Sequence, residues 1–217
     1  MENVVHLIAC MEYMKDIPDK HFDLAIVDPP YGIGDFSQSD STEKVIWNNN
    51  IPDGEYFIEL IRISKKRIIW GANYYNCFEN GNGAVIWYKN IGHPSMSHCE
   101  IASVSGQKKV DYIHINWSGG IRKQQNDFCH PCQKPVALYK WLLTNYAKPG
   151  QTIFDSHVGS GSSRIACHDM GFDFIGCELD PDYWQAQEDR YNNHCLQGNL
   201  FKPEEIQKSI YSDKELF

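Results

Sequence analysis

The chain has 217 residues, of which 42% are hydrophobic and 13% are aromatic, and this composition is typical of a globular protein rather than a disordered one. Its length favours one domain, residues 1–217, with a sizeable hydrophobic core. The formal net charge of −8 excludes a protein that coats nucleic acid mainly by neutralising phosphates.

The N-terminal half contains short apolar runs that predict β-strands over residues 4–8, 22–27, 67–70 and 84–88. Apolar residues at helical spacing predict helices over 11–17 and 55–64. Residues 33–50 are polar and contain three consecutive asparagines, which predicts a loop, and residues 81–83 predict a turn. From about 89 to 128 the pattern changes to short β-like pieces and loops, which we interpret as a small insertion in the domain.

The C-terminal third alternates regularly between the two kinds of element. Pro135 is suited to start a helix that ends before Pro149, and Asp180 and Pro181 are suited to cap a last helix that runs to about residue 195. Between them the pattern predicts strands over 152–155 and 172–178 and a helix over 162–170. This alternation predicts an α/β fold with a mostly parallel, twisted sheet and helices on both faces.

A carboxylate and an aromatic ring follow the second predicted strand. Residues 28–32 read Asp-Pro-Pro-Tyr-Gly and come directly after the apolar run 22–27. The carboxylate and the proline carbonyls can accept hydrogen bonds from the exocyclic amine of an unstacked base, and the tyrosine ring can stack on that base. A turn at the end of a strand is the alternative interpretation, because proline and glycine occur in turns of every kind.

A glycine-rich segment, residues 154–162, joins the predicted strand 152–155 to the helix that follows. Open α/β sheets bind ligands at such a position, beside a helix N-terminus. A lone Gly-x-Gly is usually only a turn, but here Glu178 ends the next strand. In nucleoside-binding sheets an acidic residue at that position accepts hydrogen bonds from ribose hydroxyls. For Glu178 the alternative is a solvated strand end.

Residues 130–135, His-Pro-Cys-Gln-Lys-Pro, resemble the His-Pro-Thr-Gln-Lys-Pro element of the DNA amino-methyltransferases. These enzymes use S-adenosylmethionine to methylate an exocyclic nitrogen of adenine or cytosine. Residues 28–32 and 154–162 resemble the same family. Further matches at 70–73, 87–89, 97–100, 117–119 and 174–178 and at Tyr183 extend the resemblance to approximately residues 4–192. The resemblance implies a Rossmann-like, S-adenosylmethionine-dependent methyltransferase fold with a circularly permuted order of motifs.

The resemblance also implies roles for individual residues. The implied catalytic residues are Asp28, Pro29, Pro30 and Tyr31. Asp28 and the Pro29 carbonyl would bind the target amine, and Tyr31 would stack on the extruded base. The expected cofactor-binding residues are Lys134, Asp155, Gly159, Ser160, Gly161, Ser162 and Glu178. Lys134 would pair with the methionine carboxylate of the cofactor. The chain departs from the family at residues 156–157, where members usually carry Pro-Phe, and at Ala9, where many carry an Asp-Cys pair.

The Asp-Pro-Pro-Tyr segment precedes the glycine-rich loop by more than a hundred residues, an order that resembles the beta group of this family. It implies N6-methylation of adenine in double-stranded DNA by direct transfer to a flipped base. Aspartate at position 28 favours adenine without excluding N4 of cytosine. A catalytically silent DNA- or cofactor-binding descendant is one alternative, favoured by Ala9, the altered loop and the acidic balance. Methylation of RNA or protein is another, disfavoured by the motif order.

Basic residues concentrate in the middle of the chain, where nine basic side chains face three acidic ones between residues 60 and 125. We therefore interpret residues 89–128 as a small target-recognition insertion. The expected DNA-binding residues are Lys89, Lys108, Lys109, Arg122 and Lys123, together with His93. Trp47 and Trp117 can stack on bases, but tryptophan is more often a core residue, and we favour the core.

The eight cysteines lack the dense spacing of a small secreted framework, so they predict reduced thiols in the cytoplasm of a bacterial or phage-infected cell. Cys129 and Cys132 have the spacing of half a zinc site, but no second pair follows, so we expect no metal. No apolar run approaches the roughly 20 residues of a membrane span, and the N-terminus lacks a signal-like segment. The small size and the lack of an endonuclease-like segment favour a stand-alone modification enzyme of a phage or mobile element, and the resemblance implies that it can form a homodimer.

Overall fold

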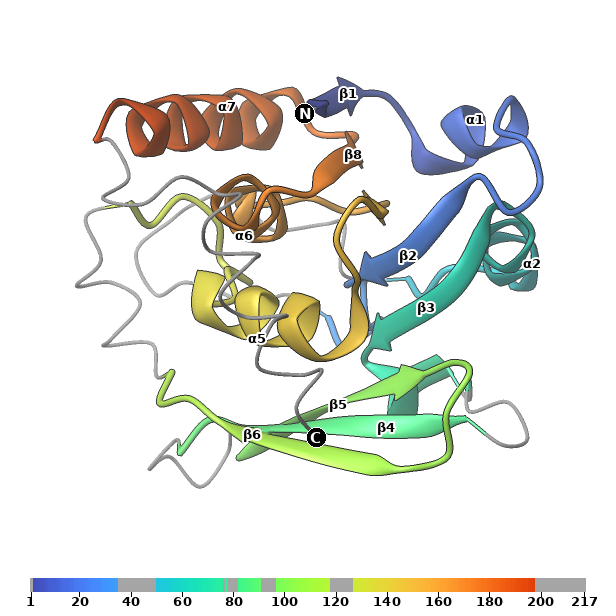
Figure 1. The fold of residues 1–217 in the computed structure, drawn as a ribbon. Helices are drawn as coiled ribbons and strands as arrows, with labels where there is room; N and C mark the ends of the chain where they lie inside the picture. The colour runs from blue at the N-terminus through green and yellow to red at the C-terminus, as the bar shows by residue number, and fades with distance from the viewer. Residues whose placement is uncertain are drawn as a thin grey trace.

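The computed structural model describes residues 2–34, 50–75, 77, 82–90, 97–117 and 127–197 (Figure 1). Its strands are β1 (Asn3–Leu7), β2 (Phe22–Val27), β3 (Ser64–Trp70), β4 (Gly83–Tyr88), β5 (Cys99–Val104), β6 (Val110–His114), β7 (Thr152–Asp155) and β8 (Asp173–Glu178). Its helices are α1 (Cys10–Lys15), α2 (Gly54–Ile63), α3 (Ala72–Tyr75), α5 (Val136–Tyr146), α6 (Ser162–Met170) and α7 (Pro181–Leu196).

The strands form one sheet in the order β1-β8-β7-β2-β3-β5-β4-β6. The first five strands in this order are mutually parallel, and β4 and β6 also pair in parallel. Only β5 runs against its two neighbours, β3 and β4. The carboxyl ends of β2, β3, β7 and β8 therefore meet at one edge of the sheet, together with the amino end of β5. This edge is where α/β sheets bind their ligands.

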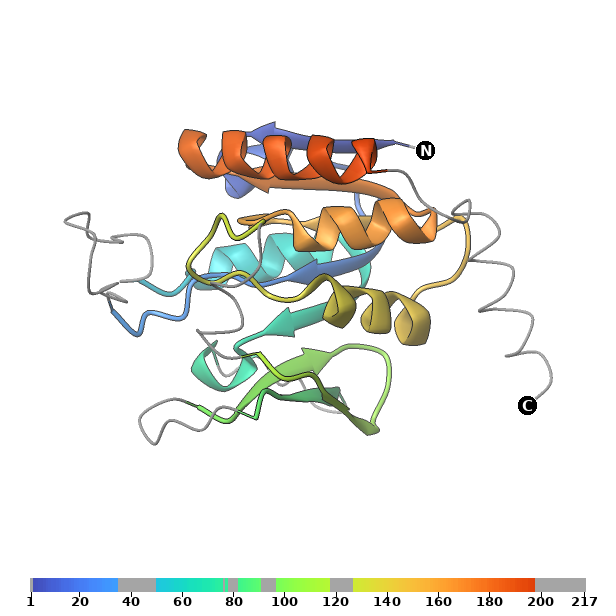
Figure 2. The ribbon, with the colours of Figure 1, turned by 90° about the vertical axis from the view of Figure 1, so that its left-hand side faces the viewer.

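Helices cover both faces of the sheet, with α5, α6 and α7 on one face and α1 and α2 on the other (Figure 2). Strand β2 shows why, because its side chains alternate between the two cores. Leu24 and Ile26 pack with α5 and α6, whereas Ala25 and Val27 pack with α1 and α2. A strand buried on both faces reads as a continuous apolar run, which is the pattern that made β2 predictable.

Several predicted elements are confirmed residue for residue, namely β2, β7 and α6. The α7 cap is also confirmed, because the Asp180 carboxylate accepts hydrogen bonds from the N–H groups of Asp182 and Tyr183. The mostly parallel sheet is confirmed for five of its seven pairings, and antiparallel β5 is a correction. Most of the loop predicted over 33–50 lies outside the described residues.

Strand β3 begins three residues before its predicted start, because α2 passes into it at Ser64 without a loop. The predicted segment 89–128 contributes β5 and β6, which extend the sheet itself. No disulfide joins any of the eight cysteines, all of which lie in described segments. Within the described ranges, none of the helices has the length and apolar character that crossing a membrane requires.

Candidate active site

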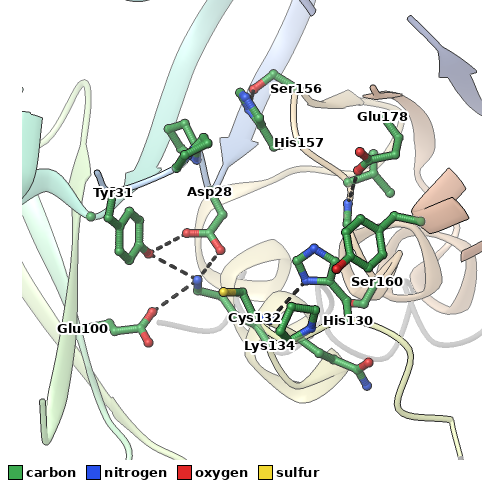
Figure 3. Close-up of a pocket in the computed structure, with 18 of the residues that line it drawn as sticks. Asp28, Tyr31, Glu100, His130, Cys132, Lys134, Ser156, His157, Ser160 and Glu178 are labelled. Carbon is green, nitrogen blue, oxygen red and sulfur yellow. Dashed lines mark hydrogen bonds and ion pairs between the residues drawn. The ribbon is translucent and has the colours of Figure 1, made fainter. Parts of the chain in front are cut away.

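A cavity of about 1270 Å³ opens at the carboxyl edge of the sheet (Figure 3). Its walls include Asp28 to Tyr31, Lys134, the loop from Ser156 to Ser160, and Glu178. The two segments singled out in the sequence, more than a hundred residues apart, therefore face one space. Pockets for a single small ligand usually measure roughly 300–1,000 Å³, so this cavity has room for two ligands side by side.

Asp28 lies at the end of β2 and uses both carboxylate oxygens. Oδ1 accepts a hydrogen bond of 2.5 Å from the Tyr31 hydroxyl, and Oδ2 is ion-paired with the Lys134 ammonium. Burial raises the pKa of Asp28 above its usual value, and the neighbouring Lys134 ammonium opposes that shift. The carboxylate is thus a desolvated acceptor, held in one orientation by two donors.

Lys134 lies between two carboxylates of the protein in the wall of the cavity, and its contact with a cofactor carboxylate stays a prediction. Its ammonium is ion-paired with Asp28 and lies 3.2 Å from Oε2 of Glu100. Although burial opposes the charged form, the two carboxylates raise the pKa of Lys134, so it remains an ammonium. Lys134 therefore belongs to the same charge cluster as the Asp-Pro-Pro-Tyr segment.

Glu100 was matched to the family in the sequence but was given no role. It projects from β5 and accepts a hydrogen bond of 2.8 Å from Lys89. Burial pushes its pKa up, but the ammonium groups of Lys134 and Lys89 lower it to about 2. Because β5 is antiparallel, its amino end delivers Glu100 to the edge where the other strands deliver their carboxyl ends. No sequence signal for that strand direction was recognised.

The proline carbonyls, predicted to accept hydrogen bonds from a target amine, already share one donor within the protein. The Tyr75 hydroxyl in α3 lies 2.5 Å from the Pro29 oxygen and 2.9 Å from the Pro30 oxygen, and donates to this pair. A carbonyl oxygen has two lone pairs, so Pro29 retains one for a further donor. Tyr75 was not among the predicted site residues, and its contact fixes both carbonyls in the wall of the cavity.

The ring of Tyr31 is also closely enclosed. It stacks on Tyr74 with a centroid distance of 4.9 Å and an interplanar angle of 17°. Gly71, at φ +73°, packs against the ring so closely that a Cβ there would lie 2.4 Å from Tyr31 Cε1. Glycine at position 71 is therefore required both for the backbone turn and for the space that the Tyr31 ring occupies.

The glycine-rich loop and Glu178 meet at the other end of the cavity. The Gly159 N–H donates to Oε2 of Glu178 at 2.8 Å, while Oε1 accepts from the N–H groups of Leu179 and Asp180. Gly159 and Ser160 line the cavity, and Gly159 packs against the His130 ring. Gly161 adopts φ +75° directly before α6, which allows the turn into that helix.

Three predicted cofactor-binding residues, Asp155, Gly161 and Ser162, do not line the cavity. Asp155 accepts hydrogen bonds from the His157 N–H at 3.0 Å and from the Ser163 hydroxyl at 2.6 Å. Ser162 donates to the Lys134 carbonyl at 2.7 Å. The side chains of Asp155 and Ser162 point into the protein, because buried polar groups of the loop need hydrogen-bond partners. These two residues stabilise the loop from the side that faces away from the cavity.

We expect Asp155→Asn to change how stability depends on pH. Burial raises the pKa of Asp155 to about 7, so its stabilising contribution is complete below its usual value near 4 and is lost as the pH rises through about 7. Asparagine carries no charge; its oxygen can accept from the His157 N–H, and its amide can donate to the Ser163 hydroxyl, which reverses that hydrogen bond. Between pH 5 and pH 8 the wild type should therefore lose roughly 2 kcal/mol of unfolding free energy that the variant does not lose. Urea denaturation of both proteins across this pH range measures the difference. Parallel pH profiles for the two proteins would contradict this expectation.

His157 stands where the resembling family carries phenylalanine, and it is neutral here. Burial lowers its pKa to about 4, and its Nδ1 lies 2.8 Å from the Ser156 hydroxyl, which in turn lies 2.7 Å from the Tyr56 hydroxyl. His157 and Ala9, the two departures noted in the sequence, both line the cavity. The imidazole thus presents an uncharged ring to the cavity, as phenylalanine does.

The predicted DNA-binding residues do not form one surface. Lys89 is only 11% exposed and is paired with Glu100 inside the cavity wall. Lys108 and Lys109 lie on the β5–β6 connection, at the sheet edge opposite the cavity, and Lys109 pairs with Asp111 at 3.0 Å. These three lysines therefore lie at two different places in the fold, and their contact with DNA stays a prediction. His93, Arg122, Lys123 and Trp47 lie outside the described residues.

Trp117 is a core residue, as favoured from the sequence, and its indole N–H donates to the Gln133 carbonyl at 2.7 Å. Cys129 and Cys132 do not come together with a third ligand. Among the residues that the structure describes, no three His, Cys, Asp or Glu side chains are grouped so that they can hold a metal ion.

Comparison with known proteins shows that this chain is similar to DNA methyltransferases. Residues 86–189 match a family model described as DNA methylase, for N6 and N4 methyltransferases. The type II methyltransferase M.HpaI of Haemophilus parainfluenzae is 22% identical over 230 aligned positions, which cover 83% of this chain and 71% of that protein.

Two solved structures share the fold. The M1.HpyAVI–SAM complex aligns with a TM-score of 0.60 at 19% identity, over 86% of this chain and 98% of that one. The cytosine-N4-specific PvuII DNA methyltransferase aligns with a TM-score of 0.65 at 12% identity, over 98% of this chain and 92% of that one. Residues 86–189 thus carry a match to the N6/N4 family of DNA methylases, and the chain as a whole is similar to a type II methyltransferase and shares the fold of two DNA methyltransferases.

Proposed function

We propose that this protein transfers the methyl group of S-adenosylmethionine to the exocyclic N6 of adenine in double-stranded DNA. The observation that carries the proposal is the position of two acceptors, the part-buried Asp28 carboxylate and the Pro29 carbonyl, in the same cavity as the Gly159 turn and Glu178. One end of the cavity is suited to a nucleoside and the other to an amino group. The type II methyltransferase M.HpaI is a relative in keeping with this activity.

The fit of S-adenosylmethionine rests on the loop between β7 and α6. Gly159 has no side chain to fill the space beside the His130 ring, and the Ser160 and Gly159 backbone borders the cavity. Glu178 already accepts three backbone hydrogen bonds, yet two carboxylate oxygens offer about four lone-pair sites, which leaves one for a ribose hydroxyl. We therefore assign the nucleoside to Glu178 and the Gly159 turn. The solved structure of M1.HpyAVI is a complex with SAM.

When bound, S-adenosylmethionine supplies a methyl group attached to a positively charged sulfur. Asp28 and the Pro29 carbonyl accept hydrogen bonds from the two amino protons and so direct the nitrogen lone pair toward that methyl group. Asp28 also lies where it can take the proton that the nitrogen loses once its bond to carbon has formed, and burial raises the pKa of Asp28 in that direction. The target base has to leave the duplex to reach this depth.

Cytosine N4 is the second candidate acceptor, because the PvuII enzyme of the same fold is specific for it. Both bases present an exocyclic amine beside a ring nitrogen, so Asp28 and Pro29 serve either. Aspartate at position 28 favours adenine. We keep residues 89–128 as the segment proposed to recognise the target sequence, and the homodimer remains a prediction from resemblance.

The proposal is tested by following a tritiated methyl group from S-adenosylmethionine into nucleic acid. We expect label in unmethylated double-stranded DNA and none in RNA or in protein extract. Cofactor binding with no transferred label would support a catalytically silent descendant instead, and label in RNA alone would overturn the choice of substrate.

Glu178→Gln tests the assignment of the nucleoside end. The amide keeps the shape but turns one acceptor into a donor that faces the backbone N–H groups and the ribose. We expect cofactor affinity, measured by isothermal titration calorimetry, to fall by roughly ten- to a hundred-fold, because a charge-assisted hydrogen bond is lost and a donor is left unpaired. Unchanged affinity would remove Glu178 from the cofactor site. Asp189→Asn, on the exposed side of α7, is the matched control, because it also replaces a carboxylate by the amide of the same shape.

A further inference from the structure

Four charged groups lie together at the base-facing end of the cavity, and the proposed chemistry uses only one of them. Asp28 and Glu100 are carboxylates, and Lys134 and Lys89 are ammonium groups, so the cluster is neutral overall. Lys134 is shared between the two carboxylates, whereas Lys89 contacts only Glu100 within the cluster. Glu100 is therefore linked to Asp28 through Lys134 (Figure 3).

Glu100 has an acceptor atom in reserve. Its Oε1 takes the hydrogen bond from Lys89, but Oε2 is buried and makes no hydrogen bond to any residue that the structure describes. The Lys134 ammonium is 3.2 Å from that oxygen, close enough for ion pairing but badly oriented for a hydrogen bond. Burying a carboxylate oxygen that accepts no hydrogen bond destabilises the folded protein unless a donor can reach that oxygen.

Both oxygens of Asp28, in contrast, already have a donor. Oδ1 accepts from Tyr31 and Oδ2 from Lys134, so each oxygen keeps one lone pair for a further donor. A target amine that binds Oδ2 shares that oxygen with the Lys134 ammonium, which is the stronger donor. The rings of Tyr31 and Trp70 lie within 5.6 Å and 5.7 Å of the Lys134 nitrogen and confine it to this corner, so the anion it can move toward is Glu100.

We propose that Glu100 is a positioning residue that receives the Lys134 ammonium when the target amine binds Asp28. The inference deepens the proposed function and rests on it. Glu100 touches neither substrate nor cofactor in this account. It makes Asp28 available by offering Lys134 a second carboxylate a short movement away, and the buried cluster stays neutral throughout.

A charge on Glu100 also acts on the titration of Asp28. Its negative charge raises the pKa of Asp28, whereas Lys134 lowers it. The other titratable groups whose charges interact with Asp28 are Tyr31, Tyr56, Tyr75, Tyr139 and Asp155. None of these changes in Glu100→Gln, which removes one charge and keeps the side-chain shape. The pKa of Asp28 should therefore fall.

The first test is a ¹³C NMR titration of the Asp28 carboxyl in wild type, Glu100→Gln and Glu100→Asp. We expect Glu100→Gln to lower the Asp28 pKa by about one unit and Glu100→Asp, which keeps the charge, to restore most of it. Glu188→Gln is the matched control, because Glu188 forms a part-buried ion pair with Arg164 far from the cavity. An unchanged Asp28 titration in Glu100→Gln, or an equal shift in Glu188→Gln, would overturn the proposal.

The second test is the single-turnover rate of methyl transfer. In Glu100→Gln the ammonium has Asp28 as its only anion, so we expect the rate to fall by roughly ten-fold or more. We also expect the acid limb of its pH profile to move to lower pH while cofactor affinity is retained. A loss of rate without a moved limb would indicate a structural role only. If wild type transfers no methyl group but the titration shifts, the proposed function fails and the link between Glu100 and Asp28 stands; transfer without a shift means the reverse.

Discussion

Asp28→Ala is expected to lower the single-turnover rate of methyl transfer by about a thousand-fold, because the amine loses the charged acceptor that directs its lone pair. Cofactor affinity should change by less than about three-fold, since Asp28 lies at the opposite end of the cavity from Glu178. The fold should survive, because Lys134 keeps Glu100 as a carboxylate partner. Rapid-quench kinetics and isothermal titration calorimetry measure the two quantities separately.

Asp28→Asn is the matched control for this variant. The amide keeps the size of the side chain and one acceptor oxygen but removes the charge. We expect a smaller loss of rate, about ten- to a hundred-fold, which separates the contribution of hydrogen bonding from that of charge. A parallel loss of rate and cofactor affinity in Asp28→Ala would show that the two ends of the cavity are not independent and would contradict the division of roles.

Lys134→Met is expected to destabilise the folded protein by about 3–5 kcal/mol at pH 7, the usual cost of removing one partner of a buried ion pair. Asp28 loses its ammonium partner, and Glu100 keeps only Lys89. Without Lys134 the folded-state pKa of Asp28 rises further, so the folded protein binds a proton more readily than the unfolded chain. The variant should therefore regain stability as the pH falls from 8 to 5. Urea denaturation across this range measures both effects.

Lys65→Met controls for the loss of any lysine. Lys65 is 54% exposed and pairs with Asp23 at 2.7 Å. Exposed pairs of this kind contribute about 0–1 kcal/mol, so this variant should remain close to wild type at every pH. If Lys134→Met were no less stable than Lys65→Met, the charge cluster would not be a buried, interdependent unit.

The sequence was most informative where one strand or helix carries its own pattern. β2 and β7 are buried on both faces and read as apolar runs, and α7 starts with an Asp-Pro pair that caps it. The position of Asp28 at the end of β2 followed directly. Asp28 and the glycine-rich loop were each predicted to follow directly after a strand, and in the structure both line one cavity at the same edge of the sheet.

The sequence was least informative about contacts between elements. The ion pairs of Lys134 with Asp28 and Glu100, which come from two different strands, were not predicted. Tyr75 meets the proline carbonyls only because α3 follows β3 at the same edge. Strand direction decides such contacts, and a short apolar run such as β5 does not reveal its direction. For the same reason the sequence did not reveal that Lys108 and Lys109 lie at the edge of the sheet opposite the cavity.

The measurement that tests the central claim most directly is the identity of the methylated nucleoside. Unmethylated genomic DNA is incubated with the protein and S-adenosylmethionine that carries a deuterated methyl group, and the DNA is digested and analysed by mass spectrometry. The account predicts deuterated N6-methyl-2′-deoxyadenosine from wild type and almost none from Asp28→Ala. Deuterated N4-methyl-2′-deoxycytidine in its place would contradict the assignment of adenine, and equal product from both proteins would contradict the role of Asp28.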